Sequence, residues 1–272
     1  MNRFARKIMP ATFALLCLLA TVGAIAQRPT AASKPVPTPP PYVDNQPLPA
    51  DLGFDLGETL TYRVSNGEKP IAEIIFQAKE RKLIGRQDSL VLSATVTSAE
   101  DGNGVLRAGD SILAHVDPET LTPFELSITL SNLTRLNQNA RFDQNSGTIS
   151  FGSDRVDAPI GTHCILSFLY AIRSFNLMPT KDASNPINDT RVAVYWEGKP
   201  YIFMLRPSEF ETITVNGKKV SAQRVTIKTG VPQIDALGLK IWLSSDDDRA
   251  PLQINLGSYK AELIQKNQQR VK

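Results

Sequence analysis

The sequence predicts a mainly β domain of the α+β class, in which a strongly curved antiparallel sheet or half-barrel wraps around one central apolar helix. Three observations predict this class. After Gly53, most of the chain alternates apolar and polar residues with a period of two, as strands with one buried face do. Short turn signals such as Asn216-Gly217 separate these segments, which favours antiparallel pairing. Only residues 162–176 show the apolar spacing of a convincing helix.

Residues 1–26 have the pattern of a cleavable secretory leader. A basic start precedes an apolar run, which ends in the small-x-small cleavage motif Ala24-Ile25-Ala26. The run is shorter than the roughly 20 residues that span a bilayer, so we favour a signal peptide over a membrane anchor. Cys17 follows Leu16, where a lipidation site has a small residue, which argues against a lipoprotein. We therefore expect an exported protein of the periplasm or cell envelope, with no transmembrane segment after cleavage.

The mature chain is predicted to be neutral and to hold one cysteine. The full sequence has 30 basic and 27 acidic residues, and the leader removes Arg3, Arg6 and Lys7. A chain without net charge does not attract phosphate backbones, so we expect no nucleic-acid partner. Cys164 alone remains after cleavage, which excludes an internal disulfide and requires a substantial hydrophobic core.

The mature chain begins with a tether and continues as one domain. Residues 27–52 are rich in proline and predict an extended, disordered tether. A single β-rich domain is predicted for residues 53–266, followed by a polar tail at 267–272. We expect no parallel crossover unit. Strands are predicted near residues 72–78, 90–97, 111–116, 140–142, 148–151, 192–196, 201–205, 212–215, 220–227, 239–243, 252–256 and 259–264.

The predicted helix, residues 162–176, carries one apolar stripe. Thr162 is expected to cap its first free N–H groups, and Pro179 lies just beyond its end. A helix this apolar must be covered on much of its surface, and a curved antiparallel sheet is the simplest cover. The stripe follows i, i+3, i+4, i+7 spacing at Ile165, Phe168, Leu169 and Ile172.

The catalytic motifs that we sought are absent from the sequence. There is no nucleophile elbow, zinc-protease motif, P-loop or dinucleotide fingerprint, so we predict a protein that is not an enzyme and uses no cofactor or metal. His163 and Cys164 are adjacent, but neighbouring helical residues point in different directions, so we favour structural roles for both. His115 is expected on a strand surface or edge. Asp246-Asp247-Asp248 lacks the spacing of a calcium loop and is expected to form a solvated turn.

Two segments supply a candidate ligand site. Arg173 lies on an otherwise apolar helix, where a guanidinium needs a carboxylate partner or an anionic ligand. We predict that Arg173 pairs with Asp246 and that an apolar cavity is lined by Phe168 and Trp242. The predicted ligand-binding residues are Phe168, Tyr170, Arg173, Trp242 and Asp246.

Several segments resemble one family of exported bacterial proteins. They are Glu58-x-Leu60-x-Tyr62, the hairpin at residues 140–151, the helix core at 166–173 and the segment 241–251. Together they resemble domain-of-unknown-function family 3108 over most of residues 53–265. Members usually carry an acid at the position of Cys164, so any role of that acid does not transfer. The resemblance implies an envelope protein without assigned activity, similar in outline to the half-barrel carriers of periplasmic lipoproteins.

Three functions fit these observations. We favour a non-catalytic envelope protein that binds or carries an apolar small molecule, a lipid or a lipidated partner in a cavity of the curved sheet. The first alternative is a structural or assembly factor with a filled core, whose partner is an envelope protein. The second alternative is a hydrolase that uses Asp246 or His163. A cavity next to the helix favours the protein that binds or carries an apolar ligand, and a filled interior favours the structural or assembly factor.

Overall fold

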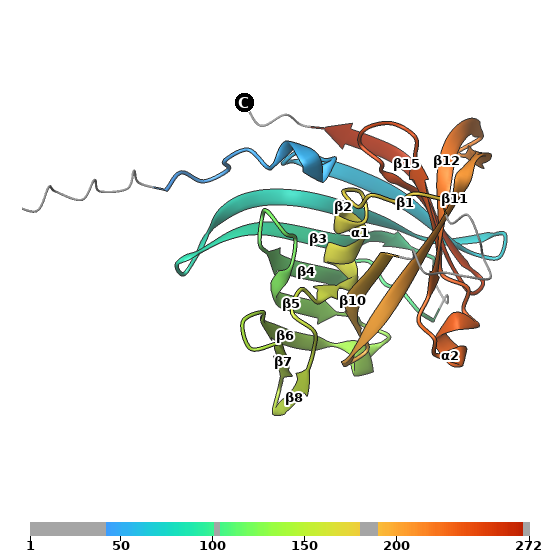
Figure 1. The fold of residues 1–272 in the computed structure, drawn as a ribbon. Coiled ribbons are helices and arrows are strands. Elements are labelled where there is room, and N and C mark those ends of the chain that lie inside the picture. Colours follow the sequence, from blue (N-terminus) through green and yellow to red (C-terminus); the bar gives the residue numbers. More distant parts are fainter. Residues whose placement is uncertain (1–41, 101–103, 180–189, 269–272) are drawn as a thin grey trace, which may run out of the picture. The chain divides into compact units, whose positions relative to one another are not determined.

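The computed structural model describes residues 42–100, 104–179 and 190–268. The predicted leader, residues 1–26, and the first part of the predicted tether lie outside these residues. As predicted, the described chain is mainly β, and its strands form one open 15-stranded sheet (Figure 1). The strand order runs from β8 through β1 to β15 and then back down to β9, so the first and last strands of the domain pair with each other.

The helical elements are few and short. The helix expected from the sequence is present as α1 (Ile165–Ala171). A second helix of four residues, α2 (Pro232–Asp235), was not expected from the sequence. None of the helices in the described chain is long and apolar enough to cross a membrane. Two 3-10 turns are η1 (Ala50–Leu52) and η2 (Thr134–Leu136). The strands are β1 (Glu58–Asn66), β2 (Lys69–Ile84), β3 (Gln87–Ala99), β4 (Ser111–Val116), β5 (Pro123–Thr129), β6 (Gln138–Asp143), β7 (Thr148–Phe151), β8 (Asp154–Asp157), β9 (His163–Cys164), β10 (Thr190–Trp196), β11 (Lys199–Val215), β12 (Lys218–Lys228), β13 (Lys240–Ser244), β14 (Pro251–Leu256) and β15 (Tyr259–Gln268).

The pairing of β3 with β4 shows how the alternating sequence produces two different faces. Leu92 lies opposite Ala114, and both side chains are fully buried in the core cluster that also contains residues of α1. The next pair, Ser93 opposite Leu113, points to the other side, because successive strand residues alternate between faces. We call the side that packs on α1 the inner face and the opposite side the outer face.

The helix α1 starts later than predicted because the preceding residues join the sheet. His163 and Cys164 form the two-residue strand β9, which pairs in parallel with β10, so the expectation of purely antiparallel pairing was wrong here. Cys164 has an extended backbone and is the N-cap, and its Sγ accepts a hydrogen bond from the backbone N–H of Ser167 at 3.4 Å. Thr162, the predicted cap, instead donates its hydroxyl to the carbonyl of Pro159.

The same helix ends before the predicted residue 176. The backbone N–H of Arg173 donates to the carbonyl of Tyr170 at 3.2 Å, and that of Ser174 donates to Ala171 at 3.0 Å. These i to i−3 bonds tighten the chain into a turn after the last α-helical residue. The helix is therefore seven residues long, and most of it is buried.

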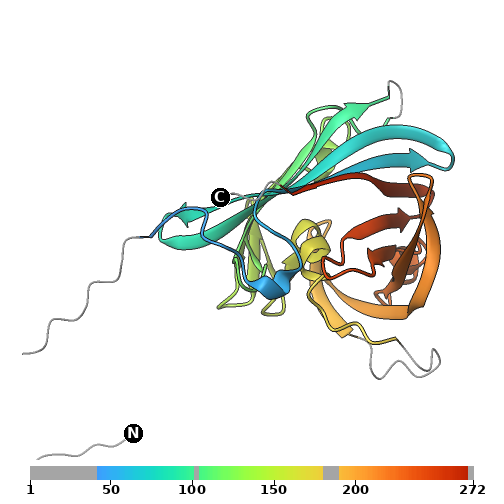
Figure 2. The same cartoon turned by 90° about the horizontal axis from the view of Figure 1, so that it is seen from above.

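Residues of α1 contribute to two hydrophobic clusters. Leu166, Tyr170 and Ala171 pack in a cluster built on β2–β7, whereas Phe168 and the C-cap residue Ile172 pack in a second cluster built on β10–β14. Figure 2 shows α1 between the green strands of the first group and the orange strands of the second. The helix thus joins the two clusters.

Strands that lie far apart in the sheet order also touch. The hydroxyl of Tyr195 on β10 donates to Oε1 of Gln138 on β6 at 2.9 Å. The ring of Tyr195 makes an edge contact with Phe142 of β6, and it lies 6.1 Å from the ring of Phe151 of β7. Parts of the sheet near its two ends therefore lie close together in space, although the edges at β8 and β9 do not pair with each other.

The folded unit begins about ten residues before the predicted domain boundary at Gly53. Leu52 is buried, and the backbone N–H of Asn45 donates to the carbonyl of Arg81 at 2.6 Å. The hydroxyl of Tyr42 donates to Asp88 at 2.7 Å. Residues 42–52, assigned to the tether from their prolines, therefore pack on the β2–β3 hairpin, because their apolar and hydrogen-bonding side chains find partners there.

Candidate functional site

The structure does not bring the five residues predicted to bind a ligand together in one site. Phe168 and Tyr170 are fully buried in different core clusters. Trp242 lies on the outer face of β13, opposite Arg224, and its indole N–H donates to Glu211 at 2.6 Å. A cavity lined jointly by Phe168 and Trp242 was therefore a wrong prediction, because the sheet lies between the two side chains.

Arg173 does have the carboxylate partner that its burial requires, but the partner is Glu58. The guanidinium donates to both carboxylate oxygens of Glu58, at 2.5 and 3.0 Å, and both side chains are fully inaccessible. It also donates to the backbone carbonyls of Gly53 at 2.5 Å and Asp248 at 2.8 Å. The predicted pair with Asp246 was wrong, since Arg173 reaches that loop only through a backbone oxygen.

Asp246 has a local role in the turn between β13 and β14. Its carboxylate accepts hydrogen bonds from the hydroxyl of Ser244 at 2.5 Å and from the backbone N–H of Arg249 at 3.1 Å. Asp246 and Asp247 are exposed, as a solvated turn requires. In the part of the chain that the structure describes, no three His, Cys, Asp or Glu residues converge as a metal site would need.

His163 and Cys164 are held by contacts within the core. Nδ1 of His163 lies 3.1 Å from the carbonyl oxygen of Leu121 and 3.3 Å from the hydroxyl of Ser167. Burial lowers the pKa of His163 to about 4, so the ring is neutral at physiological pH. Burial also raises the pKa of the Cys164 thiol, which already caps α1. These contacts give both residues structural roles.

A slot lined almost entirely by apolar side chains lies between α1 and the inner face of β2–β4. Its volume is about 130 Å³. The helix contributes Ile165 and Leu169, which belong to the predicted apolar stripe and are only partly covered. All lining residues except Asp110 and Ser111 are apolar. They are Ile74, Phe76, Ala94, Val96, Leu106, Ile112, Leu130, Ile165, Leu166 and Leu169.

The slot continues into a wider hollow of about 430 Å³. Ile112, Leu130 and Ile165 line both spaces, so we treat the two as one inner cleft. Beyond these shared residues, the wider part is bordered by η2, β6, β7 and the turn between β10 and β11. Its additional lining residues are Ile128, Arg135, Leu136, Asn137, Gln138, Phe151, Trp196, Glu197 and Gly198.

Asp110 holds two segments that border the inner cleft. Its carboxylate accepts hydrogen bonds from the backbone N–H groups of Arg107 at 2.9 Å and Ser131 at 2.8 Å. Burial acts to raise the pKa of Asp110, but these hydrogen bonds outweigh it and hold the pKa below its usual range. The segments that carry Leu106 and Leu130 are thereby fixed next to each other.

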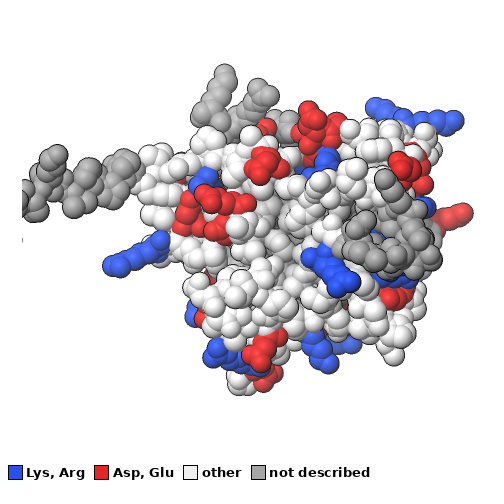
Figure 3. Space-filling view, in the orientation of Figure 1, with Lys and Arg blue, Asp and Glu red and all other residues white. Residues whose placement is uncertain are grey.

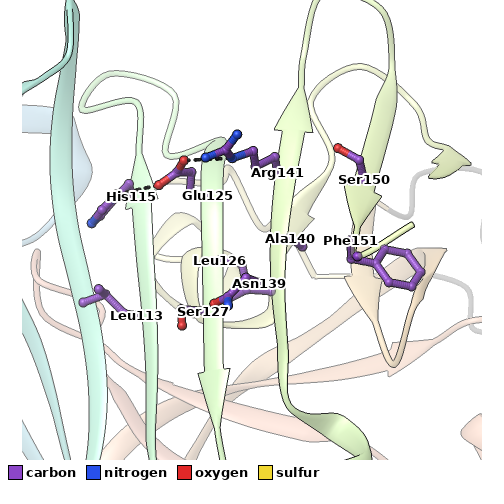
Figure 4. A pocket seen from close by; sticks show the side chains of 11 residues that line it. Leu113, His115, Glu125, Leu126, Ser127, Asn139, Ala140, Arg141, Ser150 and Phe151 are labelled. Atoms are coloured by element: carbon purple, nitrogen blue, oxygen red, sulfur yellow. Dashed lines mark ion pairs between the residues drawn. The ribbon is translucent and has the colours of Figure 1, made fainter. Parts of the chain in front are cut away.

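A second hollow, of about 540 Å³, lies on the outer face of β4–β7 (Figure 4). Glu125 lies between the two other titratable side chains of this hollow. One of its carboxylate oxygens is 3.4 Å from Nδ1 of His115, and the other is 3.3 Å from Nε of Arg141. His115 is on the outer surface of β4, as predicted, though not on an edge strand. The side chains of Glu125 and Arg141 are 46% and 81% exposed, so water screens this pair and we do not place the candidate site here.

The surface charge gives no strong preference for one sign. On the face drawn in Figure 3, basic and acidic side chains are intermixed in small groups over the described part of the domain. This distribution agrees with the near balance of 30 basic and 27 acidic residues in the sequence. The inner cleft is therefore distinguished by its apolar lining.

Comparisons with known proteins leave the family open. No family model and no curated protein matches the chain, so membership of domain-of-unknown-function family 3108 stays a prediction. One solved structure, a Bacteroides fragilis protein described as exported and as having a YmcC-like fold, is 11% identical. The match covers 79% of this chain and 97% of that one, with a TM-score of 0.33. A score this low supports no argument about fold or function.

Proposed function

We propose that this protein is a non-catalytic protein of the bacterial envelope that binds the apolar part of a lipid or lipidated partner in the inner cleft. The observation that carries the proposal is the lining of the slot beside α1, where ten apolar side chains meet only two polar ones. Water in such a slot finds few hydrogen-bond partners, so an apolar chain gains by replacing it. Contiguous apolar surface of this kind is typical of ligand sites.

The arrangement of the sheet supports the same proposal. We infer that the sheet forms a half-barrel around α1, because α1 contacts β3 and β4 as well as β9 and β10. In such a half-barrel, side chains fill the space on one side of the helix, where Phe168 and Ile172 are fully buried. Ile165 and Leu169 pack against the same cluster but are less covered, and they line the cleft. Export to the periplasm or envelope follows from the leader pattern in residues 1–26.

Two neighbouring residues of β4 provide a matched test. Ile112 lines the inner cleft, and Leu113 lines the hollow on the opposite face of the same strand. We expect Ile112→Trp to fill the cleft and abolish saturable binding of the apolar fluorescent probe N-phenyl-1-naphthylamine. Leu113→Trp should bind the probe as the unmodified mature chain does, and circular dichroism should show both variants folded.

Two results would contradict the proposal. The first is an unmodified mature chain that takes up no probe. The second is a folded Ile112→Trp variant that binds the probe with unchanged affinity. If Ile112→Trp fails to fold, the smaller change Ala94→Leu at the slot wall replaces it, with the same expected loss of binding.

A second candidate function is an envelope assembly factor, and it is favoured by the small size of the slot. At about 130 Å³, the slot has room for only part of an acyl chain unless the ligand extends into the wider hollow. On this alternative, the protein binds its partner through its surface. Binding of a membrane protein that survives Ile112→Trp, in the absence of probe uptake, would favour it.

A further inference from the structure

The wider part of the inner cleft carries one cation and one anion that have no partner among the described residues. Arg135, on η2, and Glu197, in the turn between β10 and β11, both line this hollow. Neither side chain forms an ion pair or side-chain hydrogen bond with any residue that the structure describes. Both are exposed at the mouth of a space whose interior is apolar.

The other polar groups at this mouth are already used to fix the rim. Oδ1 of Asn137 accepts the backbone N–H of Leu130 at 2.6 Å, which ties η2 to the end of β5. Oε1 of Gln138 accepts the hydroxyl of Tyr195, which ties β6 to β10. The two unpartnered charges are therefore carried by segments that these bonds hold in place.

The opposite charges restrict the headgroup that fits an apolar chain in this cleft. Because both residues line one hollow, a purely anionic headgroup at Arg135 shares that hollow with the carboxylate of Glu197, and a purely cationic headgroup at Glu197 shares it with the guanidinium of Arg135. A zwitterionic headgroup can pair its negative group with Arg135 and its positive group with Glu197. Guanidinium groups bind phosphate well, and an ammonium group is attracted both by a carboxylate and by an aromatic ring such as that of Trp196, which lines the same hollow.

We propose that the cleft binds a single-chain amphiphile with a zwitterionic phosphate–ammonium headgroup. The end of the apolar chain occupies the slot between α1 and β2–β4, and the rest of the chain crosses the wider hollow. The phosphate lies at Arg135, and the ammonium lies at Glu197 beside Trp196. One chain is specified because the slot is narrow, with a volume of about 130 Å³. This inference rests on the proposed function, since it needs the apolar part of the ligand to enter the inner cleft.

Four amphiphiles with the same saturated chain test the headgroup separately from the chain. They are lysophosphatidylethanolamine, lysophosphatidylglycerol, the free fatty acid and the uncharged monoacylglycerol. Each displaces N-phenyl-1-naphthylamine from the mature protein below its critical micelle concentration, which gives its relative affinity. We expect lysophosphatidylethanolamine to bind most tightly.

Two variants, each of which replaces a charged side chain with a neutral one, test which residue binds the phosphate and which binds the ammonium. Arg135→Gln should weaken both phosphate amphiphiles by about two- to fivefold, the range of an exposed ion pair, and leave the monoacylglycerol unchanged. Glu197→Gln should weaken lysophosphatidylethanolamine by a similar factor without weakening lysophosphatidylglycerol. Ser150→Ala, in the outer hollow, is the matched control and should change nothing.

The outcomes distinguish the two proposals. Equal affinity for all four amphiphiles, unchanged in both variants, overturns the headgroup inference while leaving an apolar binding site. Preference for lysophosphatidylglycerol or for the fatty acid overturns it as well. If neither the probe nor any amphiphile binds, the proposed function itself is wrong.

Discussion

The buried pair of Arg173 and Glu58 gives the sharpest prediction for stability. Both side chains are fully inaccessible, and two hydrogen bonds at 2.5 and 3.0 Å join them. Glu58→Gln keeps the shape of the side chain but removes its charge, which leaves a buried guanidinium without a counter-ion. Breaking a buried pair in this way costs about 3–5 kcal/mol. For a domain of this size, that lowers the melting temperature by about 6–20 °C.

Urea unfolding followed by circular dichroism measures this effect. The expected signature is a lower midpoint with an unchanged slope, because the loss is in the native state and the exposed area stays similar. Lys266→Ala is the matched control: Lys266 lies 3.8 Å from Glu58, but its side chain is 23% exposed and water can replace it. We expect that variant to lose no more than about 1 kcal/mol.

A double variant separates the charge effect from packing. Arg173→Met combined with Glu58→Met removes both charges and should be more stable than either single change, because no isolated charge remains buried. The reasoning is refuted if Glu58→Gln costs less than about 1 kcal/mol, which is the value of an exposed pair. It is also refuted if the two single losses simply add in the double variant.

Two further predictions concern the residues before α1. Burial holds the pKa of His163 at about 4, below its ordinary 6.5. As the pH falls, the imidazole therefore becomes protonated in the unfolded chain before it does in the folded chain. Stability should therefore fall by roughly 3 kcal/mol as pH drops from about 6.5 to 4, and His163→Gln should remove that part of the pH dependence in urea titrations. Cys164 is fully buried and its thiol pKa is raised, so a thiol reagent should modify it only in denaturant. Fast labelling of the native protein would contradict its role as a buried cap.

The sequence was sufficient to predict most of the strands and the apolar stripe of the helix, because both depend on local periodicity. The strands β1, β5, β8 and β9 were not among those predicted, and β11 was predicted as two shorter strands. The alternation that predicted residues 90–97 corresponds to β3, whose inner-face residues Leu90 and Leu92 are fully inaccessible. The residues Ile165 and Leu169 were assigned to one stripe, and both lie next to the cleft. Their contacts could not be predicted, since those depend on which strands approach the helix.

The errors at the ends of the helix have a common physical origin. The predicted helix included His163 and Cys164, but both residues are extended in the structure. Pairing with β10 satisfies their backbone hydrogen-bonding groups, and this tertiary contact overrides the local helical preference. Similarly, the need of Arg173 for a carboxylate was evident from its apolar surroundings. The choice of Glu58, 115 positions earlier, was not, because nothing in local spacing reveals a partner that distant.

The contacts that hold α1 also determine the geometry of the cleft. A helix of seven residues is too short to be stable by its own hydrogen bonds, so its position depends on the contacts at its two ends. Cys164 fixes its start to β10, and Arg173 fixes the turn after it to Glu58 on β1. Ile165 and Leu169 lie between these two anchors and form one wall of the slot. The two anchors therefore keep this wall in place without any contribution from a ligand. A preorganised binding site requires this property.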